Sequence, residues 1–279
     1  MDLTTHTSLS PIRSGFAPGF VNYKKGCTRL AAATDKVYQL FAHGRWFSPG
    51  TLASSTTKTG RHDIAEIWIN GMDCVFTPLL KWPSSAHVRK HMPLSFRMSF
   101  PKTTCIIDGT EFFIEKPQSP TAQSQTDSNY KHANTYTALV STTPSGAFHF
   151  ISELWEGSTS DKYITKESGF QDKIKPGDEV MTDRGFVIRD LSLTRKATLI
   201  IPPFTPKCKW GKGKRLNEEE VKKTKSIAKH RIHVERVIER LKNFRILSGT
   251  IPLKIMSCVN QIVKVCAFFC NLLKPLVNK

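Results

Sequence analysis

The chain has 279 residues, 39% of them hydrophobic and 17 of them phenylalanine. That is enough apolar material for a sizeable packed core, and it excludes a wholly disordered chain. The net charge of +18 predicts attraction to a polyanion, most often nucleic acid, with an anionic membrane surface as the rival partner. Half of this excess lies between residues 207 and 245, where 14 Lys and Arg accompany 5 Glu. A binding surface explains this concentration, and a solvated charged helix is the simpler alternative.

The seven cysteines form no CxxC pair and no spacing typical of a zinc site, so we expect reduced thiols in an intracellular protein. The first residues lack the apolar run of a signal peptide. The apolar tail, residues 255–277, is interrupted by Asn, Gln and Lys. It is too polar to span a bilayer and predicts a terminal helix docked on the core, without a membrane partner.

The N-terminal third divides into a leader and a helical segment. Residues 1–50 are rich in Ser, Thr, Gly and Pro without a clear period, which is typical of a divergent or poorly ordered leader. Residues 62–81 carry apolar side chains at helical spacing. Residues 82–101 are bounded by prolines and predict a linker with a short helix. We therefore treat 51–100 as a helical segment and linker.

After Pro101 the pattern changes to strands. Residues 103–115 are β-branched and aromatic, and 135–154 divide into a hairpin at residues 144–146. A short helix follows within 156–168, then strands at 177–186 and 196–204. A long helix is predicted from Asn217 to about Leu247. This order predicts one mixed α/β domain over 101–279, with a sheet flanked by helices and a C-terminal helix.

The long helix carries one acid beside its buried stripe. On a helix of about 100° per residue, Glu235 lies about 40° and Lys242 about 20° from Arg231, whereas Glu239 lies about 80° away and points further toward water. A carboxylate at the rim of the stripe, among cations, is held ionised by its neighbours, which suits a metal ligand. The apolar stripe consists of Ile227, Val234, Ile238 and Leu241.

Two further acids, Asp108 and Asp183, belong to apolar strand patterns. A carboxylate there is costly to bury unless a positive charge meets it. With Glu235, they could hold two divalent ions about 4 Å apart, an arrangement that binds the attacking and leaving oxygens of a phosphodiester. Mg²⁺ suits such oxygen ligands. The simpler alternative is that each Asp caps the segment that follows its strand.

Four motifs in order resemble one family. IIDGTEFFIEKP, GSTSDKYI, EVMTDRGF and RIHVERVIERLKNFRIL are similar to the Harbinger-type DDE transposases, which are related to IS5-type transposases. The R-x3-E-x6-K motif of the wider clan is present as Arg231, Glu235 and Lys242, with Ala228 at the position of the clan's tyrosine. The similarity extends from about Trp68 to Ile251.

This resemblance implies an RNase H-like fold and metal-dependent cutting and joining of DNA with Mg²⁺ or Mn²⁺. It implies that Asp108, Asp183 and Glu235 are the catalytic and metal-binding acids, and that Arg231 and Lys242 contact phosphate or steady the triad. It also implies a nuclear protein with a separate Myb-like partner, a homo-oligomer, and a remnant of a helix-turn-helix segment within 51–100.

Several residues keep two interpretations. The basic loop 207–215 predicts a DNA-backbone clamp, with a soluble insertion as the alternative; its DNA-binding candidates are Lys212, Lys214 and Arg215. Asp161 is a fourth acid near the metals or, in the simpler case, a first-turn acid of a helix. The rival functions are a catalytically inactive, host-adopted DNA-binding protein and a basic RNA-binding protein.

Overall fold

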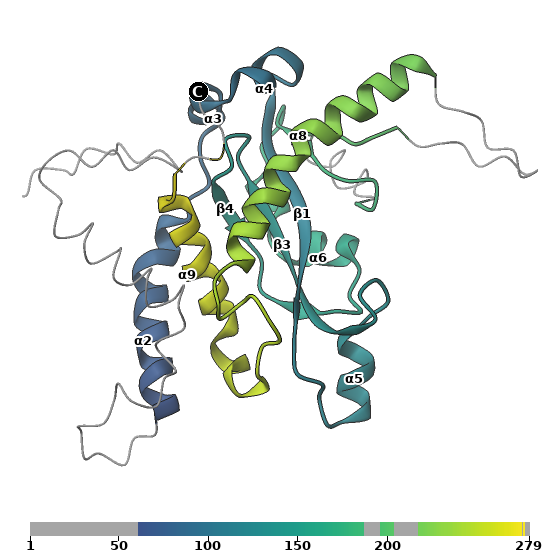
Figure 1. Ribbon diagram of the computed structural model, residues 1–279. Helices are drawn as coiled ribbons and strands as arrows, with labels where there is room; N and C mark the ends of the chain where they lie inside the picture. Colours follow the sequence, from purple (N-terminus) through teal and green to yellow (C-terminus); the bar gives the residue numbers. More distant parts are fainter. Residues whose placement is uncertain (1–60, 187–195, 204–216, 275, 277–279) are drawn as a thin grey trace, which may run out of the picture.

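The computed structural model describes residues 61–186, 196–203, 217–274 and 276, although the side chains of 61–68 are not described. The predicted mixed α/β class is confirmed. A curled mixed sheet forms the centre of the molecule, and helices cover both of its faces (Figure 1). The helices before the sheet pack on the same core, because α2 (Arg61–Phe76) lies beside the C-terminal helix α9 (Val259–Leu272) (Figure 1).

In the described part of the chain the sheet has seven strands, with the order β2-β3-β1-β6-β7 and with β4 and β5 also paired to β3. β1 is antiparallel to β3 and parallel to β6, and β6 is parallel to β7. The strands are β1 (Thr103–Phe113), β2 (Asp127–Ser128), β3 (Ala133–Thr142), β4 (Phe148–Ile151), β5 (Trp155–Glu156), β6 (Glu179–Met181) and β7 (Thr198–Ile200).

Beyond α2 and α9, the described helices are mostly short, and α8 is the long exception. They are η2 (Thr77–Leu79), α3 (Ser85–His91), α4 (Leu94–Ser99), α5 (Pro120–Thr126), α6 (Asp161–Glu167), η3 (Gln171–Lys173), α8 (Glu218–Lys242) and η4 (Leu253–Cys258). α8 begins at a capping box, in which Asn217 and Glu220 each bond the other's backbone N–H.

β1 is buried on both faces, and its side chains alternate between two hydrophobic clusters. Ile106 and Phe112 belong to the larger cluster, which includes α8 and α9, whereas Cys105 and Ile107 belong to the smaller one beneath α6 and η3. Because alternate strand residues share a face, Asp108 lies on the face of Ile106 and Phe112, toward α8. The alternation of side chains along β1 therefore places Asp108 on the side of the sheet that faces α8.

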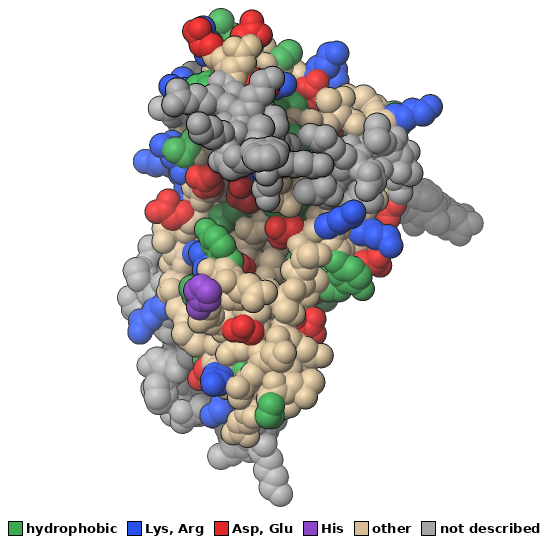
Figure 2. Space-filling model, turned by 90° about the vertical axis from the view of Figure 1, so that its right-hand side faces the viewer, with side chains coloured by type: hydrophobic (Ala, Val, Ile, Leu, Met, Phe, Trp, Pro, Cys, Tyr) green, Lys and Arg blue, Asp and Glu red, His purple; other side chains and the backbone are tan. Residues whose placement is uncertain are grey.

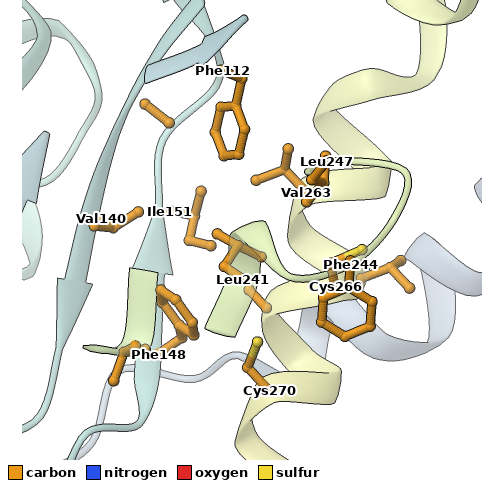
Figure 3. Close-up of a cluster of buried hydrophobic side chains, with 14 of the residues drawn as sticks. Phe112, Val140, Phe148, Ile151, Leu241, Phe244, Leu247, Val263, Cys266 and Cys270 are labelled. Carbon is orange, nitrogen blue, oxygen red and sulfur yellow. The ribbon is translucent and has the colours of Figure 1, made fainter. Parts of the chain in front are cut away.

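The larger cluster joins the sheet to the C-terminal helices. Leu241 and the turn after α8, with Phe244 and Leu247, lie between the sheet and α9 (Figure 3). The expectation that the C-terminal tail is too polar to span a bilayer was wrong, because Leu253–Leu272 is long and apolar enough to cross a membrane by length and composition. Half of that window is nevertheless buried inside the fold. Cys266 and Cys270 on α9 are buried and belong to this packing.

The predicted hairpin is confirmed. β3 and β4 pair around a turn in which Gly146 has a φ of 87°, a conformation that glycine adopts without strain. Four predictions of extent were wrong. The strands predicted at 177–186 and 196–204 are only Glu179–Met181 and Thr198–Ile200. α8 ends at Lys242 rather than near Leu247, and the linker 82–101 contains two helices. β2, β5 and α5 were not predicted.

Candidate active site

Asp108 and Asp183 lie at the same level, the first within β1 and the second just after the neighbouring parallel strand β6. Ile106 of β1 is in register with Met181 of β6, and each aspartate follows two residues later. Asp108 still lies within β1, whereas Asp183 lies in the loop after β6, so placing Asp183 on a strand was wrong. The strand ends there because the chain turns, with the Phe186 N–H donating to the Asp183 carbonyl at 3.3 Å.

Arg231 of α8 lies between these two carboxylates. Its Nη2 is 3.2 Å from Asp108 Oδ2, and its Nη1 is 3.2 Å from Asp183 Oδ1. The Arg231 side chain is 10% exposed and that of Asp183 52%, so this double ion pair reaches from the core to the surface. Arg231 Nε is buried without a hydrogen-bond partner among the described residues. The guanidinium thus holds the two acids together from α8.

The fold shifts the pKa of Asp108 strongly. Burial, reinforced by the charges of Asp183 and Glu235 and opposed by Arg231, raises the pKa of Asp108 to about 6. The Gly109 N–H donates to its Oδ1 at 3.1 Å. The influence of Glu235 on this pKa places all three acids within electrostatic range of one another. Glu235 itself is exposed on α8, one turn after Arg231.

Lys242, the other basic residue of the helix motif, lies at the end of α8. Its Nζ is 5.7 Å from the centre of the Phe112 ring. Burial and the charge of Lys131 lower the pKa of Lys242, while Glu111 and Asp108 act in the opposite direction. Lys242 therefore adds a partly buried positive charge on the same side of β1 as Asp108.

A second pair of acids lies on the other face of β1. A Cβ at Gly109 would come within 2.9 Å of Asp161 Oδ1, so this glycine admits the start of α6 against the strand. Burial and the nearby Glu111 raise the pKa of Asp161. Glu111 accepts a hydrogen bond from Thr135 Oγ1 at 2.9 Å. Asp161 follows the N-cap Ser160, which fits the interpretation as a first-turn acid.

Acidic and basic side chains are interspersed on the face that carries α5 and α6 (Figure 2). The predicted DNA contacts Lys212, Lys214 and Arg215 lie outside the described residues. The structure therefore brings Asp108, Asp183, Arg231 and Lys242 together at β1, with Glu235 beside them. The direct pairing of Arg231 with both aspartates was not specified by the sequence, because strand register determines it.

Carboxylate oxygens are the donors that Mg²⁺ and Mn²⁺ prefer, and three mutually repelling acids gain stability from a cation. The donor chemistry of Asp108, Asp183 and Glu235 thus fits divalent metal ions. Their arrangement is not a closed cage: among the described residues, no three His, Cys, Asp or Glu side chains are grouped to hold a metal ion. Arg231 supplies the positive charge between the aspartates instead.

Residues 107–271 match a protein-family model described as DDE superfamily endonuclease. The match begins at the residue before Asp108 and ends within α9. It therefore spans the sheet from β1 onward, all three acids and the long helix. No match was found among the curated proteins or the solved structures.

Proposed function

Because the chain belongs to the DDE superfamily endonucleases, we propose that it is a metal-dependent enzyme that cuts and joins DNA strands, of the Harbinger transposase type and with an RNase H-like fold. The observation that carries this proposal is that Asp108 of β1 meets Asp183 of the loop after β6, and that both form ion pairs with Arg231. The four ordered sequence motifs support the subtype.

Asp108, Asp183 and Glu235 are the proposed ligands of two Mg²⁺ or Mn²⁺ ions. When bound, such ions supply a nucleophile at neutral pH and neutralise the charge that develops on the phosphodiester. The three carboxylates would hold the ions from a strand, a loop and a helix. Asp108 is the innermost of them, with a side chain 20% exposed, and Asp183, at 52%, borders the solvent from which DNA arrives.

The proposed role of Arg231 is to hold the two aspartates in place before the metal ions bind. Its two ion pairs of 3.2 Å support this role. Lys242 would attract a phosphate of the bound strand, because its ammonium group lies near Phe112 on the same side of β1. Lys212, Lys214 and Arg215 are proposed to contact the DNA backbone further out.

The test is a nicking assay on supercoiled DNA with Mg²⁺ or Mn²⁺. We expect D108N, D183N and E235Q each to lower the rate by at least about a thousandfold, since every acid would take part in one metal site. Glu239→Gln is the matched control, because Glu239 is exposed one turn beyond Glu235 on the same helix. Equal nicking by wild type and D183N would reject the assignment.

Metal binding can be measured without catalysis. Mn²⁺ should raise the melting temperature of the wild-type protein and of E239Q, and should raise that of D108N or D183N much less. The same shift in all four proteins would show that the cation binds elsewhere.

A catalytically inactive DNA-binding protein derived from a transposase is the second candidate. The placement of Arg231 between Asp108 and Asp183 favours it, because an internal cation already compensates both acids. This function predicts DNA binding that falls with salt but does not change with Mn²⁺ or with D183N. A basic RNA-binding protein would share the salt dependence and prefer RNA in competition.

The cellular setting belongs to the same proposal. The motifs that resemble the Harbinger group support a nuclear protein that acts on transposon ends or target DNA, together with a Myb-like partner and as a homo-oligomer. Light scattering of the purified chain with and without DNA would measure the oligomer. A fluorescent fusion that stays outside the nucleus, even with the partner present, would contradict the nuclear assignment.

A further inference from the structure

A cavity of about 340 Å³ lies beside the edge strand β4, away from the acids. Its walls come from four separated parts of the chain: the segment 77–82 after α2, β4, η3 and α9. Cavities that hold small ligands begin at about this size. None of the acids near Arg231 lines it. Ile151 of β4, which lines the cavity, pairs with Val140 of β3, and Val140 pairs with Asp108 of β1. The cavity is therefore two strands away from Asp108.

Two aromatic side chains give the cavity flat apolar walls. Trp82 and Phe150 are only partly buried, so part of each ring remains accessible. Trp82 packs edge-on against Phe170, with ring centres 5.8 Å apart, and at 90° to His149, with ring centres 4.3 Å apart. These contacts hold the indole in one orientation. A fixed aromatic ring with an accessible face is a stacking surface for a nucleobase.

His149 contributes a neutral polar group. Its side chain is 3% exposed, and burial lowers its pKa to about 3. Its Nε2 lies 3.3 Å from Ser141 Oγ. At neutral pH the imidazole therefore adds no charge, and the charge of the cavity comes from its lysines.

Three lysines reach the cavity from three different segments: Lys81, Lys173 and Lys264. Lys264 is paired with the carboxylate of Glu153. Lys81 and Lys173 are exposed, and within the described residues no carboxylate forms an ion pair with either. Two uncompensated ammonium groups beside an apolar wall fit a ligand with a negative charge at one end and a flat ring at the other.

We propose that this cavity binds a nucleotide, with the base against Trp82 and Phe150 and the phosphate at Lys81 and Lys173. Nucleotides combine the flat ring and the phosphate that these walls complement. The source is either an unpaired nucleotide of a DNA strand or a free mononucleotide. The cavity is a second site, separate from the proposed nuclease centre.

The experiment uses the full chain in EDTA, so that divalent ions play no part. Calorimetry measures binding of deoxyadenosine monophosphate, inorganic phosphate and a single-stranded deoxyadenosine pentamer. In K81A/K173A, we expect nucleotide affinity to fall by at least about tenfold, since two charge-assisted contacts are lost. The control K116A/K229A removes the same charge from two exposed lysines outside the cavity and should bind like wild type.

Recognition of the base is tested separately. Wild type should bind the mononucleotide at least about tenfold more tightly than phosphate, since stacking of one base contributes on that scale. Trp82→Leu should reduce this difference, with circular dichroism as the check on folding. Tighter binding of the pentamer assigns the site to a DNA strand, and equal or weaker binding assigns it to a free nucleotide.

Equal affinity for phosphate and mononucleotide would overturn the proposal, and so would equal nucleotide affinity in wild type and K81A/K173A. Absence of binding by every probe would do the same. D183N should bind the mononucleotide like wild type. If the nuclease assignment fails, nucleotide binding in the cavity can still be tested. If nucleotide binding fails, the nuclease assignment is unaffected.

Discussion

In the acidic site, a buried guanidinium lies between Asp108 and Asp183, whereas in the cavity beside β4 two of the three lysines have no carboxylate partner among the described residues. The acids are compensated by the fold itself, and the cavity leaves positive charge for an incoming anion. The excess of +18 is thus not spread evenly. Arg231 in the interior is paired with two acids, whereas Lys81 and Lys173 at the edge of the sheet are available for binding.

Burial also shifts the pKa of a titrating group in each region. It raises the pKa of Asp108 to about 6 and lowers the pKa of His149 to about 3. The cause is the same in both cases, because a less polar environment disfavours the charged form. The difference is that Asp108 has a cation beside it, whereas His149 lies against Trp82, Ser141 and the backbone of Thr142.

Removal of the internal cation should have the largest effect. Arg231→Gln leaves Asp108 without its counter-ion, so we expect the free energy of unfolding to fall by about 3 kcal/mol in metal-free buffer. Urea denaturation measures this change. Arg236→Gln, at an exposed position on the same helix, is the control and should cost less than about 0.5 kcal/mol. Equal losses in the two variants would mean that Arg231 compensates nothing in the interior.

The buried imidazole should make stability depend on pH. Between pH 6.5 and about 3, the unfolded chain protonates His149 and the native protein does not. The free energy of unfolding therefore decreases as the pH falls through this range, by about 1.4 kcal/mol per pH unit. His149→Gln should remove this contribution to the slope, as measured by urea denaturation between pH 6 and 4.

His132→Gln, at an exposed histidine, is the control for loss of an imidazole and should keep the wild-type slope. An unchanged slope in H149Q would show that His149 accepts a proton inside the folded protein.

The ion pair at the cavity should have the smallest effect. Glu153→Gln frees Lys264, so the nucleotide should bind about two- to threefold more tightly, while stability changes by less than about 1 kcal/mol, as for exposed pairs. Calorimetry and thermal denaturation measure the two effects. Glu156→Gln removes an exposed acid from outside the cavity as a control. Weaker nucleotide binding in E153Q would show that Glu153 positions Lys264 instead of competing for it.

Local patterns in the sequence were sufficient for much of the fold. The start of α8 follows from Asn217 and Glu220, and the β3–β4 turn follows from Gly146, because each involves contacts within a few residues. β5 and β2 have only two residues each, and pairing with β3 alone makes them strands. α5 was missed despite the proline in its first turn, which was a usable signal.

By itself, the sequence identified the acids, the basic helix and the order of the elements that carry them, because periodicity and residue chemistry are local properties. Only the tertiary structure decided that Asp183 belongs to a loop, that Arg231 forms ion pairs with both aspartates, and that Trp82 and Lys264 border one cavity. These relations join residues far apart in the chain. They depend on strand register and helix packing, which the whole core determines together.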